Sequence, residues 1–275
     1  MLNTLFNFIV WDVNSDIFTI PFINHPVHWY GIFWGIGLFL SYRILSKILK
    51  DDGKRPEFLD QLTLYIVIGT VLGARLGHVL FYDPAYYLSN PLKILAVYEG
   101  GLASHGGGIG ILIALYLFAR KQKINYWWIA DRIALVVPVA GACIRLGNLM
   151  NSEIIGTPTD VPWAFVFTRV DQIPRHPAQL YEAIFCLLLF VVFYLSWNRG
   201  LFKNKNGNVF GVLLITLFSF RFVDEFFKVS QEAFEDSMLL NMGQLLSIPF
   251  VLIGLAIIMF NAFNTKSNRQ PKISS

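Results

Sequence analysis

The chain reads Gly141-Ala-Cys-Ile-Arg145-Leu-Gly-Asn148-Leu-Met-Asn151-Ser-Glu153-Ile-Ile-Gly156 directly after a mostly apolar segment, 128–139. Charged and amide side chains are costly at membrane depth, so those that occur there usually face an internal cavity and mark a site. On a helix, Gly141, Arg145 and Asn148 are spaced i, i+4 and i+7 and therefore share one face. The stretch predicts a membrane helix with a polar site that could bind an anionic head group.

The composition of the whole chain is that of an integral membrane protein. Of its 275 residues, 55% are apolar and 15% are charged, and the mean hydropathy is +0.53. Such values are rare for a soluble domain of this size. Apolar runs of about 18–25 residues have the length that a bilayer core requires. We therefore expect an all-α integral membrane protein that forms a single transmembrane catalytic domain over residues 1–275. The seven expected spans are 28–47, 58–81, 102–120, 127–147, 179–198, 208–228 and 243–262.

The distribution of basic residues predicts the orientation. Of the 22 lysines and arginines, fourteen lie in the proposed inner segments, four in the proposed outer segments and four within spans. Because basic residues accumulate on the cytoplasmic side, we expect the N-terminus outside and the C-terminus in the cytoplasm. The polar, basic segment 265–275 is then a cytoplasmic tail, which we expect to be disordered. The net charge of +4 indicates anchoring at the inner leaflet and no partnership with nucleic acid.

A glycine-rich segment, 99–110, opens the third expected span. Its sequence, Glu99-Gly-Gly-Leu-Ala-Ser-His105-Gly-Gly-Gly-Ile-Gly110, has a composition that makes a poor helix. Non-helical backbone at membrane depth is tolerated where it lines a cavity or is buried in protein, which would place His105 at the mouth of a cavity. Alternatively, the glycines serve close helix packing and His105 is a structural residue. The nearby Arg145 stripe favours the first interpretation.

A second charged stripe lies on the sixth expected span. Arg221 and Glu225 are spaced i, i+4, and Lys228 follows one turn later. One interpretation is an internal salt bridge that neutralises the helix end. The other is a second guanidinium that faces Arg145 across a cavity and grips phosphate with its planar fork. Two such arginines would repel each other unless carboxylates lay between them, for which Glu153 and Glu225 are candidates, or a bound phosphate did.

Other polar residues admit ordinary explanations. Arg75 and His78 on the second span either join the site or extend toward an interface. Tyr30 opens the first span, where aromatic residues commonly form an interface belt. Glu182, in the first turns of the fifth span, is an ordinary N-terminal helix signal. No histidine–carboxylate cluster in the sequence suggests a metal site.

Together these segments resemble the bacterial prolipoprotein diacylglyceryl transferases over nearly the whole chain. The similarity also implies the seven spans and their orientation. One position departs from some family members, which carry a tyrosine one turn before the sixth-span arginine where this chain has Leu217. The shared motifs are Tyr30-Gly31, Gly-Gly-x-x-Ser-His105-Gly-Gly, Arg145-Leu-Gly-Asn148-x-x-Asn151-x-Glu153-x-x-Gly156, His176-Pro-x-Gln-Leu-Tyr-Glu182 and Arg221-Phe-x-x-Glu225-Phe-Phe.

The resemblance implies a reaction at the bacterial cytoplasmic (inner) membrane that needs no cofactor. The diacylglyceryl group of phosphatidylglycerol would pass to the lipobox cysteine of a preprolipoprotein, releasing glycerol phosphate. Such chemistry needs a general base and cations aimed at the phosphate. We expect His105 to be the base and Arg145 and Arg221 to clamp the phosphate. The other expected roles are hydrogen bonding to glycerol or phosphate oxygens by Asn148 and Asn151, orientation of the arginines by Glu153 and Glu225, and shaping of the cavity by Tyr30 and Gly156.

Two other classes of protein would share some of these features. A secondary transporter for an organic anion would also carry arginines and a broken, glycine-rich span at mid-membrane. However, the two halves of the chain show no repeat. A scaffold that only binds an anionic lipid would explain a cavity, but it would have no need of His105.

Overall fold

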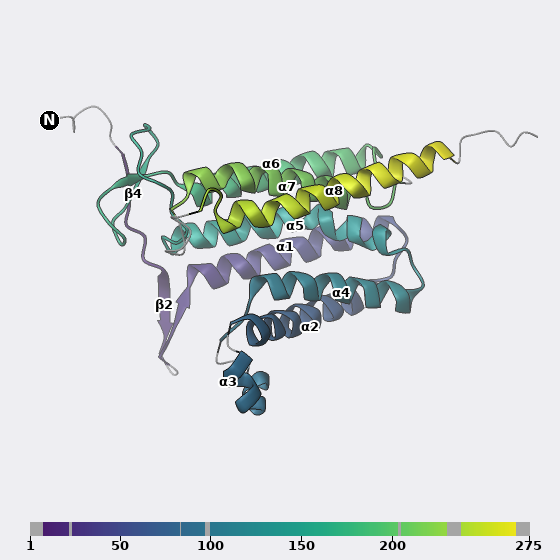
Figure 1. Cartoon of the computed structure of the whole chain (residues 1–275), viewed down its shortest axis with the longest axis horizontal. Helices are drawn as coiled ribbons and strands as arrows, with labels where there is room; N and C mark the ends of the chain where they lie inside the picture. The colour runs from purple at the N-terminus through teal and green to yellow at the C-terminus, as the bar shows by residue number, and fades with distance from the viewer. Residues whose placement is uncertain are drawn as a thin grey trace, which may run out of the picture. The chain divides into compact units, whose positions relative to one another are not determined.

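The computed structural model describes residues 8–21, 24–82, 84–96, 100–202, 205–229 and 238–267 (Figure 1). Helices account for most of these residues, and each predicted span is helical over most of its length. The sixth predicted span is a helix that ends in a 3₁₀ turn. The helical segments are α1 (Trp29–Asp51), α2 (Pro56–Phe81), α3 (Pro84–Ser89), η1 (Pro91–Leu95), α4 (Ser104–Gln122), α5 (Tyr126–Met150), α6 (Ala178–Asn198), α7 (Asn208–Asp224), η3 (Glu225–Phe227) and α8 (Met242–Ser267).

Five helices within the described residues are long and apolar enough to cross a membrane. They are α1, α2, α5, α6 and the part of α8 from Met242 to Phe263. This result confirms a helical fold of the kind expected for an integral membrane protein. Helix α8 continues to Ser267, into the segment predicted as a tail. The rest of that segment, 268–275, lies outside the described residues.

Two small sheets, which the sequence analysis did not predict, accompany the helices. Strand β1 pairs in parallel with β4, and β4 pairs antiparallel with β5. Strands β2 and β3 form an antiparallel hairpin that leads into α1. The strand bounds are β1 Ile9–Trp11, β2 Asp16–Ile20, β3 His25–His28, β4 Phe165–Phe167 and β5 Pro174–Arg175.

The chain forms two compact units, and α1 and α5 contribute residues to both. The first unit comprises Met1–Ile44 and Ile133–Ser275, and the second comprises Leu45–Arg132. In the first unit, aromatic rings stack between neighbouring helices. Phe185 and Phe220 join α6 to α7 with ring centroids 3.9 Å apart, and Phe218 and Phe250 join α7 to α8 at 4.3 Å. These contacts hold α7, the helix that carries Arg221, between α6 and α8.

In the second unit, glycines bring α2 and α4 into backbone contact. Gly69, Gly73 and Gly77 recur every fourth residue on α2 and face Gly106 and Gly110 of α4. A Cβ atom on Gly73 would meet backbone atoms of both α4 glycines. Glycines spaced in this way permit close helix approach within lipid. The expectation of non-helical backbone is therefore wrong for 104–110, because the packing against α2 offsets the low helix propensity of glycine.

Arg75 has a structural role in the second unit. Its buried guanidinium donates hydrogen bonds to the carbonyl oxygens of Ile94 at 2.9 Å, Gly100 at 2.6 Å and Gly101 at 3.2 Å, and it also contacts that of Lys93. Carbonyl groups buried in a loop need such donors. The two interpretations left open for Arg75 were a place in the polar site and a position at an interface. The structure supports neither, because the guanidinium binds the segment that precedes α4.

Candidate functional site

Arg145, near the end of α5, forms an ion pair with Glu182 of α6. The contact joins Arg145 Nε to Glu182 Oε2. Both side chains are largely buried, with 18% of the arginine side chain exposed. Arg145 Nη1 also donates to Asn148 Oδ1 at 3.3 Å. A guanidinium has five N–H donors, so these two contacts leave donors for a ligand.

Lys228 lies at the centre of the buried charges. Only 2% of its side chain is exposed, and its Nζ contacts carboxylate oxygens of Glu182, of Asp224 at 3.0 Å and of Glu225 at 3.2 Å. The change from α7 to the 3₁₀ turn η3 aligns Asp224, Glu225 and Lys228 on one side of the chain. A buried charge requires compensation of this kind, so the lysine and its three carboxylates form one cluster.

Arg221 joins the same cluster through Glu225. Arg221 Nη2 lies 3.5 Å from Glu225 Oε1, and 38% of the arginine side chain is exposed. Asn241 Nδ2 donates to Glu225 Oε2 at 3.3 Å, and Gly243 at the start of α8 packs directly against the Glu225 carboxyl group. The long ion pair leaves Arg221 less tightly held than Arg145.

We call this cluster the charge network. It contains Arg145, Glu182, Lys228, Asp224, Glu225 and Arg221, all in the first unit. Three cations face three carboxylates, so the network is balanced without a ligand. The predicted repulsion between Arg145 and Arg221 is thereby compensated by carboxylates.

Glu153, which was expected to orient the arginines, contacts two asparagines instead. Its Oε2 accepts a hydrogen bond from Asn148 Nδ2 and its Oε1 accepts one from Asn151 Nδ2, both at 3.1 Å. Gln179 Nε2 donates to the Glu153 backbone carbonyl. Glu153 therefore acts on Arg145 through Asn148, whereas Glu182 contacts the guanidinium directly.

A pocket of about 650 Å³ adjoins these amides in the first unit. Tyr30, Asn151 and Glu153 line it together with residues of the β2–β3 hairpin and Arg169. Asn151 Oδ1 is buried and has no hydrogen-bond partner among the residues that the structure describes. An unpaired buried acceptor is costly, and it fits a ligand that supplies a hydroxyl donor.

Gly156 fixes the backbone beside Lys228. Its N–H donates to the His176 carbonyl at 2.9 Å, and it forms an isolated β-bridge with Lys228. A Cβ atom at Gly156 would overlap His176 and the Phe227 carbonyl, which explains why glycine is needed there. Burial lowers the pKa of His176 below its ordinary value, so this ring is neutral at pH 7 and adds no cation to the network.

His105 lies in the second unit, exposed on the first turn of α4. Its expected role as a base stays a prediction. His78, the other histidine considered on the second span, stacks on Tyr82 with ring centroids 5.2 Å apart. Among the described residues, no group of three or more His, Cys, Asp or Glu side chains is arranged to hold a metal ion.

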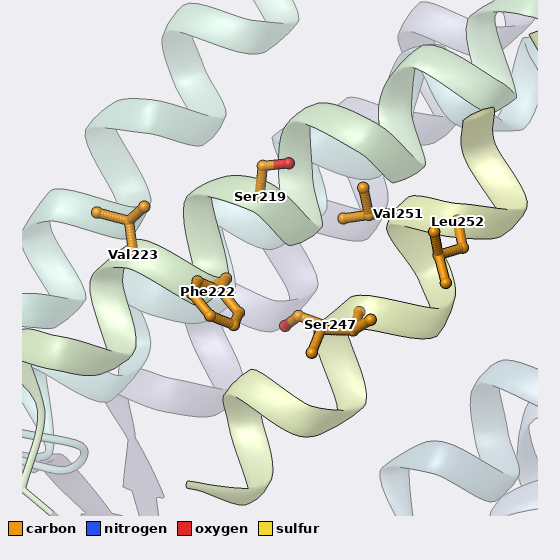
Figure 2. Close-up of a pocket in the computed structure, with 7 residues that line it drawn as sticks. Ser219, Phe222, Val223, Ser247, Val251 and Leu252 are labelled. Atoms are coloured by element: carbon orange, nitrogen blue, oxygen red, sulfur yellow. The ribbon is translucent and has the colours of Figure 1, made fainter. Parts of the chain in front are cut away.

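An apolar groove of about 320 Å³ runs between α7 and α8 (Figure 2). Phe222 and Ser247 face each other across it, with Ser219 and Val223 on α7 and Val251 and Leu252 on α8. The Ser247 hydroxyl donates a hydrogen bond to the Gly243 carbonyl, one turn away on α8. Because Gly243 packs on Glu225, this groove begins close to the network.

Sequence analysis assigns no site role to three residues of the network, Glu182, Asp224 and Lys228. It interprets Glu182 as a helix-start signal and places Lys228 on the Arg221 stripe without a role in the site. A carboxylate inside an apolar span needs a cationic partner, and this rule is the signal that identifies Glu182. The contact between Lys228 and Glu182 has no such signal, because it depends on how α6 packs against the segment that follows α7.

Comparison with known proteins gives matches over nearly the whole chain. The family model described as prolipoprotein diacylglyceryl transferase matches residues 17–260. A protein of Tolumonas auensis named phosphatidylglycerol–prolipoprotein diacylglyceryl transferase is 46% identical over 250 residues, which cover 90% of this chain and 96% of the relative. Proteins of the same name from Bacteroides fragilis and Chloroherpeton thalassium are 46% and 43% identical over 272 and 256 residues. They cover 94% and 92% of this chain, and 97% and 94% of the relatives.

Proposed function

Because this chain belongs to the prolipoprotein diacylglyceryl transferase family, we propose that it transfers the diacylglyceryl group of phosphatidylglycerol to a cysteine thiol of a prolipoprotein. It is a transferase of lipoprotein biosynthesis. The acceptor is the lipobox cysteine, and the products are a thioether-linked lipoprotein precursor and glycerol phosphate.

The reaction requires two kinds of assistance. The thiol must lose its proton, since a free cysteine has a pKa of about 8.5 and only the thiolate is a strong nucleophile. The sulfur then forms a bond to the diacylglyceryl carbon while the bond from that carbon to the phosphate oxygen breaks. Negative charge grows on the departing phosphate, so preorganised cations lower the barrier.

The observation that supports these roles is that one buried network contains both Arg145 and Arg221. Each guanidinium is oriented by a carboxylate, Glu182 for Arg145 and Glu225 for Arg221. Each also retains N–H donors that are suited to the two oxygens of a phosphate. We assign the two arginines to the phosphate.

The pocket beside the network supports a role in holding the glycerol head group. Tyr30 shapes one wall, and the unpaired Asn151 Oδ1 accepts a hydrogen bond from a glycerol hydroxyl. Glu153 fixes the two asparagines by accepting one hydrogen bond from each. Asn148 in turn contacts Arg145, so head group and phosphate are held by connected residues.

His105 is the proposed general base. An exposed imidazole on a helix held rigidly by glycine packing can accept the thiol proton. Leu217 lies on α7 where some family members carry a tyrosine, so no tyrosine takes part in proton transfer at that position.

We place the enzyme in the bacterial cytoplasmic membrane with seven crossings, the N-terminus outside and the C-terminus in the cytoplasm. The fourteen basic residues in the inner segments support this orientation. Arg145, at the end of α5, then lies toward the outer side, where a translocated lipobox peptide arrives.

The test combines purified protein in detergent, phosphatidylglycerol and a synthetic lipobox peptide, followed by mass spectrometry of the peptide. We expect a diacylglyceryl adduct on cysteine, absent when the peptide carries Cys→Ser or the enzyme carries Arg145→Ala. If folded wild-type protein binds the lipid but produces no adduct, the proposed reaction is wrong.

A further inference from the structure

The charge network connects the two arginines through a single lysine. Arg145 contacts Glu182, Glu182 contacts Lys228, Lys228 contacts Glu225, and Glu225 contacts Arg221. Residues of α5, α6, α7 and η3, with Lys228 directly after η3, are thus joined by alternating charges. Lys228 is the only residue of this row that contacts both carboxylates holding the arginines.

The position of Lys228 is fixed by its backbone as well as by its charge. Its residue forms a β-bridge with Gly156, and the neighbouring Thr157 N–H donates to the Phe227 carbonyl at 2.8 Å. On the other side, the Val229 N–H donates to the Ile155 carbonyl at 3.3 Å. The segment that follows Glu153 therefore determines where the ammonium group lies.

A carboxylate that holds an arginine also competes with the phosphate for it. If Glu182 had no partner besides Arg145, the pair would be desolvated and tightly bound. Freeing the N–H donors of Arg145 for a ligand would then cost more free energy. Lys228 shares Glu182 with Arg145 and shares Glu225 with Arg221. Its ammonium weakens each arginine–carboxylate pair and keeps the carboxylates in place when a phosphate binds.

We infer that Lys228 is a positioning residue that leaves both arginines available to the phosphate of the lipid donor. This inference rests on the proposed function. It does not require Lys228 to touch the substrate, and its buried position agrees with action through Glu182 and Glu225.

Asp224 makes it possible to separate positioning from simple charge balance. It contacts Lys228 at 3.0 Å, and among the described ion pairs it contacts neither arginine. Lys228→Met alone leaves Asp224 as a buried carboxylate without its cation, which can prevent folding. The double variant Lys228→Met/Asp224→Asn removes one charge of each sign, so two arginines face two carboxylates.

The experiment measures transfer to the lipobox peptide as the mole fraction of phosphatidylglycerol in the micelles is varied. The single variant Asp224→Asn is the reference for the double variant, because it removes the Asp224 charge and keeps Lys228. The double variant should melt near the wild-type temperature, yet its apparent KM should rise roughly tenfold, with a smaller change in kcat. Lys205→Met, at an exposed lysine outside the network, serves as the matched control.

Two results would overturn the inference. One is a double variant with the apparent KM of Asp224→Asn, which would mean that Lys228 only neutralises Asp224. The other is a loss of kcat without a change in KM. A wild-type enzyme that forms no adduct would instead contradict the proposed function, so the two failures are distinguishable.

Discussion

Arg145 shows why a charged residue in an apolar span is informative. Its guanidinium is largely buried, and its charge is compensated by Glu182, a residue of the next long helix. A lysine could supply the same charge, but as a compact ammonium without a planar fork. The proposed mechanism uses the planar arrangement of the Arg145 N–H donors as well as its charge.

We therefore expect Arg145→Lys to reduce kcat/KM for phosphatidylglycerol on the order of 100-fold, because a shorter ammonium cannot bind Glu182, Asn148 and two phosphate oxygens together. The measurement is steady-state transfer to a lipobox peptide. Near-normal turnover would show that charge alone suffices. A thermal melt in detergent controls for misfolding.

His105 is tested by a substitution that preserves size and hydrogen bonding. Glutamine cannot accept the thiol proton, so His105→Gln should lower kcat by roughly 10²- to 10⁴-fold. Stabilisation of the protein by phosphatidylglycerol in a thermal melt should stay unchanged, since the arginines still bind the lipid. Turnover within threefold of wild type would mean that the arginines lower the thiol pKa without a dedicated base.

At the scale of elements, the helices were predicted well because a bilayer imposes their length. Apolar runs such as 179–198 and 58–81 agree with α6 and α2 to within two residues at either end. Strands β1 and β4 were missed because they pair across a long stretch of the chain, and neither exceeds three residues. Short strands of this kind carry too little periodic pattern to be recognised.

The polar site was predicted in part, for a related reason. Arg145 and Asn148, and likewise Arg221 and Glu225, are close in sequence, and helical spacing places each pair on one face. Lys228 is likewise close in sequence to Asp224 and Glu225, with which it pairs. Glu182 joins the network only through tertiary contacts with Arg145 and Lys228, which no local pattern encodes.

The packing of α2 on α4 gives a prediction with an internal control. A Cβ atom at Gly110 would overlap the backbone of Gly69, whereas one at Gly108 would meet no atom within 4 Å. Gly110→Val should therefore lower the melting temperature, with a loss of roughly 1–3 kcal/mol in stability, while Gly108→Val should change it far less. Equal effects of the two variants would show that valine acts through helix propensity and not through the crossing.

For the whole molecule, the seven proposed crossings include α4 and α7, which are not among the five helices long and apolar enough to span a membrane. Helix α7 has 17 residues, so it is about 26 Å long at 1.5 Å per residue. The 3₁₀ turn η3 extends it by about 6 Å at 2.0 Å per residue. The combined length matches a hydrocarbon core of about 30 Å, which supports a crossing by α7 and η3 together.

Cysteine labelling tests this crossing and its direction. Both native cysteines, Cys143 and Cys186, are buried, so a membrane-impermeant maleimide should label them little. Single cysteines at Gln172, Lys205 and Leu239 lie before α6, before α7 and after η3, and all three positions are exposed. In intact spheroplasts we expect labelling of Gln172→Cys and Leu239→Cys, and labelling of Lys205→Cys only after permeabilisation, because the basic residues around Lys205 remain in the cytoplasm. Labelling of intact spheroplasts at Lys205→Cys but not at Leu239→Cys would show the opposite orientation. Equal labelling at both positions would mean that α7 does not cross.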